Sequence, residues 1–216
     1  MTSTEVDAPS AMVDLMHRGP VIPVVVVDDA STAVPLARAL ARGGVQVVEI
    51  TLRTTAALDA IRRISREVTD VVVGAGTVTS PRQAEEAADA GAQFLVTPGG
   101  PAGLVDAALG TGLPVLPGAT SLTEMMTLLD RGLRALKFFP AVPAGGASYL
   151  AAVHGPLPHA LFCPTGGITV DTAGTFLALP NVACVGGSWL TPATALAERD
   201  WDRVTALATT AASLRS

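Results

Sequence analysis

Short apolar runs alternate along the chain with longer segments in which apolar residues recur at helical spacing. The short runs are apolar at almost every position, which is typical of strands in a parallel sheet covered by helices. Eight such runs start 20 to 26 residues apart: Val21–Val27, Val45–Ile50, Val71–Gly74, Phe94–Thr97, Val115–Pro117, Ala135–Phe138, Ala160–Cys163 and Ala183–Gly186.

The segments between these runs resemble amphipathic helices. Examples are Ser31–Arg42, Thr54–Arg66 and Pro81–Ala90, each apolar on one stripe and starting with Ser, Thr or Pro. Eight strand–helix units at one spacing predict a (β/α)₈ barrel, of the TIM barrel type, with a short N-terminal helix. We expect residues 1–10 to be a loose lead-in and residues 11–216 to form one domain. An open doubly wound sheet is the alternative, although no Gly-x-Gly-x-x-Gly motif follows the first strand.

Composition adds limits on partners. The chain is 49% hydrophobic and only 15% charged, well below the usual quarter, so we expect neighbouring subunits to cover part of its surface. The net charge of −5 and the absence of a Lys/Arg-rich run argue against a nucleic-acid partner. The Val21–Val27 run is too short to span a membrane and has no cleavage-site pattern, which favours a cytoplasmic protein. Cys163 and Cys184 lie in separate apolar runs and are expected to be reduced core residues.

Polar residues interrupt or follow five of the predicted strands. In a barrel the active site lies at the carboxyl ends of the strands, so these residues should converge on one face. The set comprises Glu49, Thr77, Lys137, Thr165–Gly167 and Gly186–Ser188.

Lys137 is the only lysine in the chain, whereas the other 13 of its 14 basic residues are arginine. It lies between Leu136 and Phe138 in an apolar strand, where burial opposes the charged form of an amine. An amine in an apolar pocket can attack a carbonyl near neutral pH. The alternative is a lysine whose side chain extends from the strand end to solvent.

Glu49 also interrupts an apolar run. If the chain stays extended, the two-residue period of a strand places Glu49, Thr51 and Arg53 on one side. Glu49 could then transfer protons, and Arg53 could bind a substrate carboxylate. The alternative is a structural Glu49–Arg53 ion pair.

Two glycine-rich turns follow the last two predicted strands. Backbone N–H groups at Gly166, Gly167, Gly187 and Ser188 can approach an anion closely, and barrels often bind phosphate at this place. Ordinary tight turns are the alternative, but two such turns on adjacent strands, each with a hydroxyl residue, favour a phosphate site.

Histidine is scarce, and none of His17, His154 and His159 falls at the carboxyl end of a predicted strand. The sequence therefore disfavours a metal-dependent aldolase and a Ser-His-Asp hydrolase. We expect neither a metal nor a cofactor.

The same motifs resemble the bacterial 2-keto-3-deoxy-6-phosphogluconate (KDPG) aldolases, which also act as 4-hydroxy-2-oxoglutarate (KHG) aldolases. Five segments carry the resemblance in register: Val48–Thr54, Gly74–Val78, Lys137–Ala141, Cys163–Ile168 and Gly186–Leu190. The resemblance extends from about Val21 to the C-terminal helix.

This resemblance implies a class I aldolase on a (β/α)₈ barrel, a homotrimer without metal, acting on a 2-keto acid with a phosphate group. It implies that Lys137 forms the Schiff base, that Glu49 is the general acid and base, and that Arg53 and Thr77 bind the pyruvate carboxylate. The resemblance also implies roles for further residues, which line the pocket (Pro98, Phe139), select stereochemistry (Thr165) or bind phosphate (Gly166, Gly167, Gly187, Ser188).

One position departs from some relatives, which carry an arginine at the end of the first strand where this chain reads Val25-Val26-Val27. Preference between phosphorylated and unphosphorylated substrates therefore stays open. So do three other functions: a sister aldolase for the galactonate-derived substrate, a phosphate-binding barrel isomerase or synthase that forms no imine, and a non-catalytic phosphosugar-binding subunit.

Overall fold

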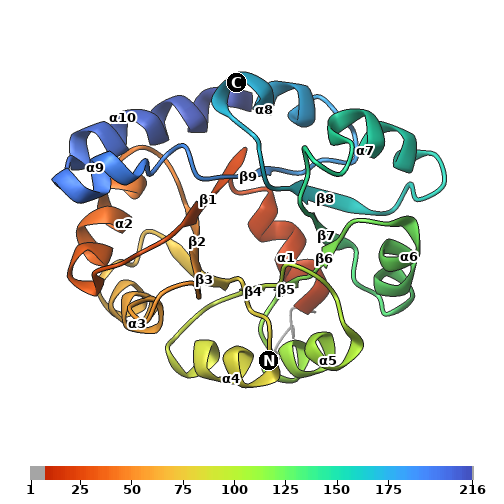
Figure 1. Cartoon of the computed structure of the whole chain (residues 1–216), viewed down its shortest axis with the longest axis horizontal. Helices are drawn as coiled ribbons and strands as arrows, with labels where there is room; N and C mark the ends of the chain where they lie inside the picture. Colours follow the sequence, from red (N-terminus) through yellow and green to blue (C-terminus); the bar gives the residue numbers. More distant parts are fainter. Residues whose placement is uncertain (1–7, 216) are drawn as a thin grey trace, which may run out of the picture.

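The structure, a computed structural model, describes residues 8–215 as an α/β fold whose paired strands all run parallel, inside a ring of helices (Figure 1). The strands are β1 (Val21–Val25), β2 (Val47–Thr51), β3 (Val72–Gly76), β4 (Leu95–Val96), β5 (Val115–Leu116), β6 (Gly118–Ala119), β7 (Ala135–Phe138), β8 (Leu161–Pro164) and β9 (Val185–Gly187). The helices are α1 (Ala8–Met16), α2 (Ala33–Arg42), α3 (Ala57–Glu67), α4 (Pro81–Asp89), α5 (Ala102–Gly110), α6 (Leu122–Asp130), α7 (Gly146–His154), α8 (Val170–Leu177), α9 (Ala193–Glu198) and α10 (Trp201–Ala212). Short 3₁₀ turns, η1 (Ala30–Thr32) and η2 (Ser213–Arg215), precede α2 and follow α10. The short N-terminal helix is confirmed as α1, whereas most of the predicted 1–10 lead-in lies outside the described residues.

The described strands form two sheets. One has six strands in the order β5-β4-β3-β2-β1-β9, and the other has three in the order β6-β7-β8. The expectation of eight continuous strands is wrong at the fifth, which is divided into β5 and β6 by Pro117. Proline has no N–H to donate to a ladder, so it interrupts the strand there.

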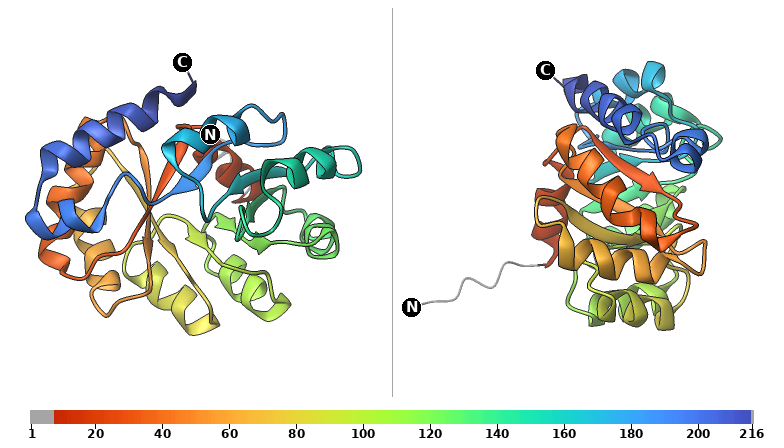
Figure 2. Two further views of the ribbon diagram at one scale, coloured as in Figure 1. Left: turned by 45° about the horizontal axis from the view of Figure 1, so that its top comes forward. Right: turned by 90° about the vertical axis from the view of Figure 1, so that its left-hand side faces the viewer.

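Hydrogen bonds link the two sheets at both junctions. The Lys137 N–H of β7 donates to the Pro117 carbonyl at 2.8 Å, next to β5. On the other side, Phe162 bridges Val182 and Thr165 bridges Gly186. The bridged partners are 20 residues apart in sequence in the first pair and 21 apart in the second. The additional residue between the two bridges corresponds to a β-bulge. The parallel strands therefore curl round a common interior (Figure 2).

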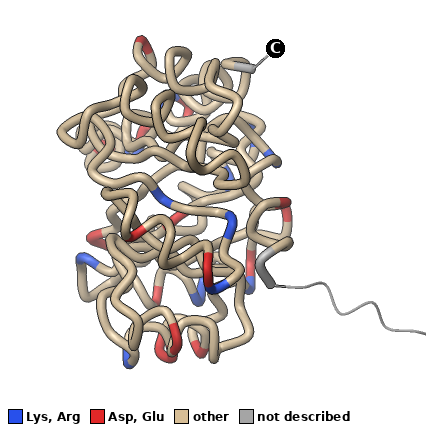
Figure 3. The backbone as a smooth tube through the Cα atoms, turned by 90° about the vertical axis from the view of Figure 1, so that its right-hand side faces the viewer, with Lys and Arg blue, Asp and Glu red and all other residues tan. Residues whose placement is uncertain are grey.

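Charged residues are unevenly distributed. Only Asp171 is charged between Phe138 and Ala197, and Figure 3 shows fewer charged residues in its upper half than in its lower half.

Cys163 and Cys184 are free and buried, which confirms the prediction for both. None of the described helices has the length and apolar character needed to cross a membrane.

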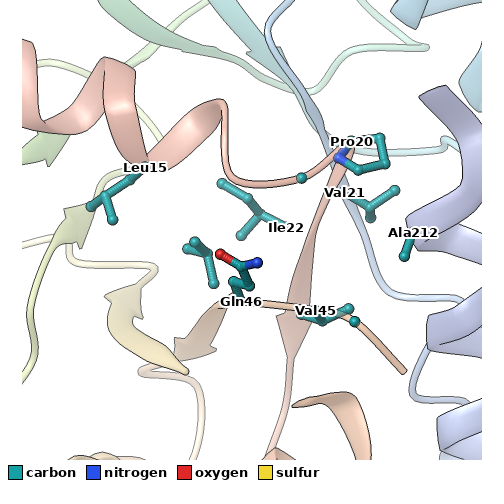
Figure 4. A pocket seen from close by; sticks show the side chains of 10 residues that line it. Leu15, Pro20, Val21, Ile22, Val45, Gln46 and Ala212 are labelled. Carbon is teal, nitrogen blue, oxygen red and sulfur yellow. The ribbon is translucent and has the colours of Figure 1, made fainter. Parts of the chain in front are cut away.

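Helix α1 closes the amino-terminal end of the strands with apolar side chains. Met12 and Met16 are fully buried against inward-facing residues that include Ile22, Val47 and Phe94. A cavity of about 10 Å³ lies beside α1, near Leu15, Ile22 and Gln46 (Figure 4). Such a volume holds about one water molecule, so this cavity has no room for a substrate.

The interior changes from apolar to polar toward the carboxyl ends of the strands. Side chains two residues apart on a strand share a face. Glu49 on β2 therefore points into the same interior as Val47, and Lys137 on β7 points into the same interior as Ala135. Glu49 and Lys137 are both buried. The polar interior therefore lies at the end opposite α1, where a barrel holds its active site.

Candidate active site

Lys137 and Glu49 form a buried ion pair between β7 and β2. Lys137 Nζ lies 3.3 Å from Glu49 Oε1 and 3.5 Å from Oε2, and the two side chains are 5% and 3% exposed. An unpaired charge in the interior costs several kcal/mol, and each of these groups is the other's partner there. The alternative of a lysine that reaches solvent is wrong, and Glu49 pairs with Lys137 rather than with Arg53.

Gly76, at the end of β3, makes room for the Glu49 carboxylate. A Cβ at position 76 would lie 1.9 Å from Glu49 Oε1 and 2.4 Å from its Cδ. Any side chain at position 76 would therefore displace the carboxylate from Lys137. Gly76 carries no chemistry of its own, so its role follows from packing across strands and was missed in the sequence.

Arg53 and Thr77 contact each other at the rim of the site. Arg53 Nε donates to Thr77 Oγ1 at 3.1 Å, and Thr77 adopts a left-handed backbone with φ of 57°. The chain does not stay extended through Arg53, which was the condition for Glu49, Thr51 and Arg53 to share one side: β2 ends at Thr51, and the Arg53 N–H donates to the Thr51 carbonyl at 2.8 Å. Thr51 is buried, and its hydroxyl is engaged with the Val25 carbonyl at 3.0 Å.

A pocket of about 350 Å³ lies above the Lys137–Glu49 pair, toward the carboxyl ends of the strands. Phe139 and Thr165, which line it, are two residues further along their strands than Lys137 and its register partner Cys163. The pocket thus occupies the next layer outward from the amine. It extends down to Val24, the register partner of Glu49. The described lining residues are Val24, Val26, Arg53, Phe139, Thr165–Ile168 and Gly186–Ser188.

The two glycine-rich turns form one wall of this pocket. Gly166 and Gly167 have φ of 105° and 78°, a left-handed conformation that favours glycine. A Cβ at Gly186 would lie 2.1 Å from Thr165 Oγ1, and one at Gly187 would lie 1.9 Å from the Trp189 ring. The wall therefore exposes backbone rather than side chains to a ligand.

Seven of the eleven sequence-predicted site residues line the pocket, and three more are joined to them by contacts. Phe139 connects the lining to the amine, since Lys137 Nζ lies 5.4 Å from its ring centroid. Pro98 is the exception: it follows β4 and is not among the lining residues, and its carbonyl packs against Gly118 instead. Val24, Val26 and Ile168 were missed, because apolar residues at strand ends carry no sequence signal that separates pocket from core.

The end of the first strand is apolar here, as the sequence indicates. Val26 lines the pocket and is 36% exposed, and Arg53 is the only charged side chain among the described lining residues. Among the part of the chain that the structure describes, no group of three or more His, Cys, Asp or Glu residues is placed to hold a metal ion.

A buried amine beside a buried carboxylate, below a pocket at the carboxyl ends of parallel strands, is an arrangement typical of α/β enzymes that use an amine as nucleophile. Residues 12–207 match the family described as "Aldolase: KDPG and KHG aldolase". The chain belongs to this family of aldolases, which are carbon–carbon lyases.

Similar proteins agree with this family. The KHG/KDPG aldolase of Escherichia coli K12 is 49% identical over 194 residues, which cover 90% of this chain and 91% of that protein. The KDPG aldolase of Legionella pneumophila, solved with pyruvate captured as a covalent carbinolamine intermediate, has a TM-score of 0.91 and 40% identity, over 97% of this chain and all of that one. The Zymomonas mobilis enzyme, solved with 3-phosphoglycerate, has a TM-score of 0.89 and 42% identity, over 94% of this chain and 96% of that one.

Proposed function

We propose that this protein is a class I aldolase that reversibly cleaves KDPG to pyruvate and glyceraldehyde 3-phosphate, and KHG to pyruvate and glyoxylate. The observation that carries the proposal is the buried Lys137–Glu49 pair, 3.3 Å apart below a pocket lined by Arg53. The covalent pyruvate carbinolamine captured in the Legionella relative supports the same chemistry for this chain.

Lys137 supplies the nucleophile. Its neutral amine adds to the C2 carbonyl of the 2-keto acid to give a carbinolamine, which takes up one proton as water leaves and so becomes a protonated imine. When the C3–C4 bond breaks, its electron pair moves toward the iminium nitrogen and forms an enamine, while the C4 carbon leaves as an aldehyde. Protonation of the enamine at C3 and hydrolysis of the imine then release pyruvate and restore the amine.

Glu49 transfers the protons. Its carboxylate lies within hydrogen-bond reach of Lys137 Nζ, so it is close to the atoms that become C2 and C3 of the bound substrate. We assign it removal of the C4 hydroxyl proton, directly or through a water, and delivery of a proton to C3. Arg53 and Thr77, which contact each other at 3.1 Å, are assigned to the pyruvate carboxylate.

The distal end of the substrate is assigned to the glycine-rich wall. Backbone N–H groups of Gly166, Gly167, Gly187 and Ser188 bind the phosphate, and Thr165 selects the configuration at C4. Phe139 covers the amine. Because Val26 adds no charge near this wall, we expect the shorter, unphosphorylated KHG to be a substrate as well.

Steady-state cleavage of three substrates tests this function. We expect pyruvate release from KDPG and from KHG, unchanged by a chelator, and cleavage of the galactonate-derived epimer at least about 10-fold less efficient, since the epimers differ by contacts worth about 1–3 kcal/mol. Faster cleavage of the epimer would identify the sister aldolase instead. Pyruvate release from none of the three would overturn the proposal.

Substituting Gly76→Ala tests the position of the Glu49 carboxylate. The added methyl group must displace that carboxylate, so kcat/KM for pyruvate release should fall by about 100-fold, the usual effect of a displacement near 1 Å. Gly103→Ala in α5 is the matched control, since a Cβ there meets no atom within 4 Å and activity should not change. Full activity in the Gly76→Ala protein would mean that catalysis does not need the observed Glu49 geometry.

We also propose that the two sheets together form a closed (β/α)₈ barrel. Hydrogen bonds at both junctions support this, as β5 and β6 belong to one strand interrupted by Pro117.

We further propose a cytoplasmic homotrimer. The exposed side chains of Leu122, Met126, Val142 and Val170, together with the single charge between Phe138 and Ala197, support burial of these segments against other subunits. Light scattering of the purified protein gives the number of subunits.

A further inference from the structure

We propose that Thr120 is a positioning residue for the aldolase: its hydroxyl holds the Phe139 backbone, and through it the aromatic ring that covers the Lys137 amine. The inference rests on the proposed function, because it concerns how the amine of that reaction is kept in place. Thr120 lies directly after β6, and nothing in its sequence context assigns it a role.

The hydrogen bond is well defined. Thr120 Oγ1 donates to the Phe139 carbonyl at 2.6 Å, in a part-buried setting between residues 19 positions apart. It follows the end of the β6–β7 ladder, where the Lys137 N–H donates to the Pro117 carbonyl at 2.8 Å and the Phe139 N–H donates to the Ala119 carbonyl at 3.4 Å.

The ladder itself cannot supply this bond. In a parallel pair, the next donor to the Phe139 carbonyl would be the Ser121 N–H. That N–H donates instead to Glu124 Oε2 at 2.8 Å, as part of the capping box that starts α6. The strand ladder and the α6 cap both require the Ser121 N–H, and the cap has it. The Thr120 hydroxyl therefore replaces this N–H as the donor to the Phe139 carbonyl.

Thr120 is held firmly enough to act in this way. Its own N–H donates to Glu124 Oε2 at 2.9 Å, and Glu124 also accepts the Ser121 hydroxyl at 3.0 Å. These backbone hydrogen bonds lower the pKa of Glu124, so its carboxylate stays charged to a lower pH than a free glutamate would. The backbone at Thr120 is thus fixed from one side and bonded to β7 from the other.

Phe139 transmits this position to both parts of the site. Its ring centroid lies 5.4 Å from Lys137 Nζ, and its Cε2 lies 3.3 Å from where a Cβ of Gly166 would be. One aromatic ring therefore lies close both to the amine and to the wall assigned to the distal group. Loss of the carbonyl anchor frees this ring, and a cation–π contact depends on ring position.

The substitution Thr120→Val tests the proposal, since valine keeps the shape and removes the donor. We expect kcat and the rate of borohydride-trapped imine formation with pyruvate to fall about 10-fold with little change in KM, and the pH profile of kcat to shift. Thr120→Ser, which keeps the hydroxyl, should restore most of both rates. Thr127→Val is the control, because the exposed Thr127 hydroxyl also donates to a backbone carbonyl, that of Thr123 at 2.8 Å, but away from the site.

The outcomes distinguish the positioning role of Thr120 from the proposed aldolase function. If the native protein forms no imine, the proposed function fails. If the native protein forms the imine and Thr120→Val matches it in kcat, imine formation and pH profile, the positioning role is overturned. Should Thr120→Val fold poorly, Thr120→Ser and Thr120→Ala are compared at equal folded fraction, and equal kcat in those two variants overturns it as well.

Discussion

Replacing Lys137 with methionine is expected to lower kcat for pyruvate release by about 10⁴-fold or more, the effect of removing a covalent nucleophile. No other lysine can take over, because the chain has only this one. The substitution also leaves Glu49 buried without its cation, and breaking a buried pair costs about 3–5 kcal/mol of folding free energy. Stopped-flow or coupled assays of pyruvate release measure the first effect, and chemical denaturation measures the second.

Two further variants separate chemistry from stability. Lys137→Arg keeps a positive charge beside Glu49 but cannot form the imine, so it should be stable and inactive. The double substitution of Lys137→Met with Glu49→Gln removes both charges and should regain stability without regaining activity. Activity above about 1% in stable Lys137→Arg protein would exclude an essential imine at Lys137, since only weak non-covalent catalysis should remain there.

Replacing Glu49 with glutamine should slow the proton transfers and leave imine formation intact. Glutamine has the shape of glutamate, but its amide cannot accept and return a proton. Exchange of the pyruvate C3 protons into deuterated water, followed by NMR, should slow by about 10³-fold, within the range for loss of a general base. Borohydride reduction should still trap pyruvate on the variant.

Glu67→Gln is the matched control for this result, since Glu67 ends α3 on the exposed surface. Its exchange rate should equal that of the native protein. If Glu49→Gln exchanged C3 protons at the native rate, another group would have to transfer them, and Glu49 would remain only a partner for the lysine charge.

The alternation of apolar runs and amphipathic segments predicted the parallel α/β fold well. β7 was predicted with its bounds, and the other runs overlap the observed strands. Prediction failed where one residue changes the local bonding: Pro117 divides the fifth strand, and the turn after Thr51 ends β2 before Arg53. The helix and strand propensities of the sequence could not show that the β6–β7 ladder and the α6 cap compete for the Ser121 N–H, because this competition involves a strand, a helix cap and a loop together.

The candidate site was predictable where a residue is chemically unusual for its strand. Lys137 and Glu49 both stand out in apolar runs, and the structure brings them into contact across 88 positions. Gly76, Val26 and Thr120 were not found, because their roles come from neighbours on other strands. The assignment of Pro98 to the site rested on the family resemblance alone, and Pro98 is not among the residues that line the pocket.

Borohydride reduction in the presence of pyruvate tests the central claim most directly. Intact mass should show one reduced pyruvate per native chain, equally with a chelator present, and peptide mapping should place it on Lys137. Lys137→Arg should give none, which separates this adduct from one on the α-amino group. Absence of an adduct on native protein that binds pyruvate, or an adduct that persists in Lys137→Arg, would contradict the assignment of Lys137 as the imine-forming residue.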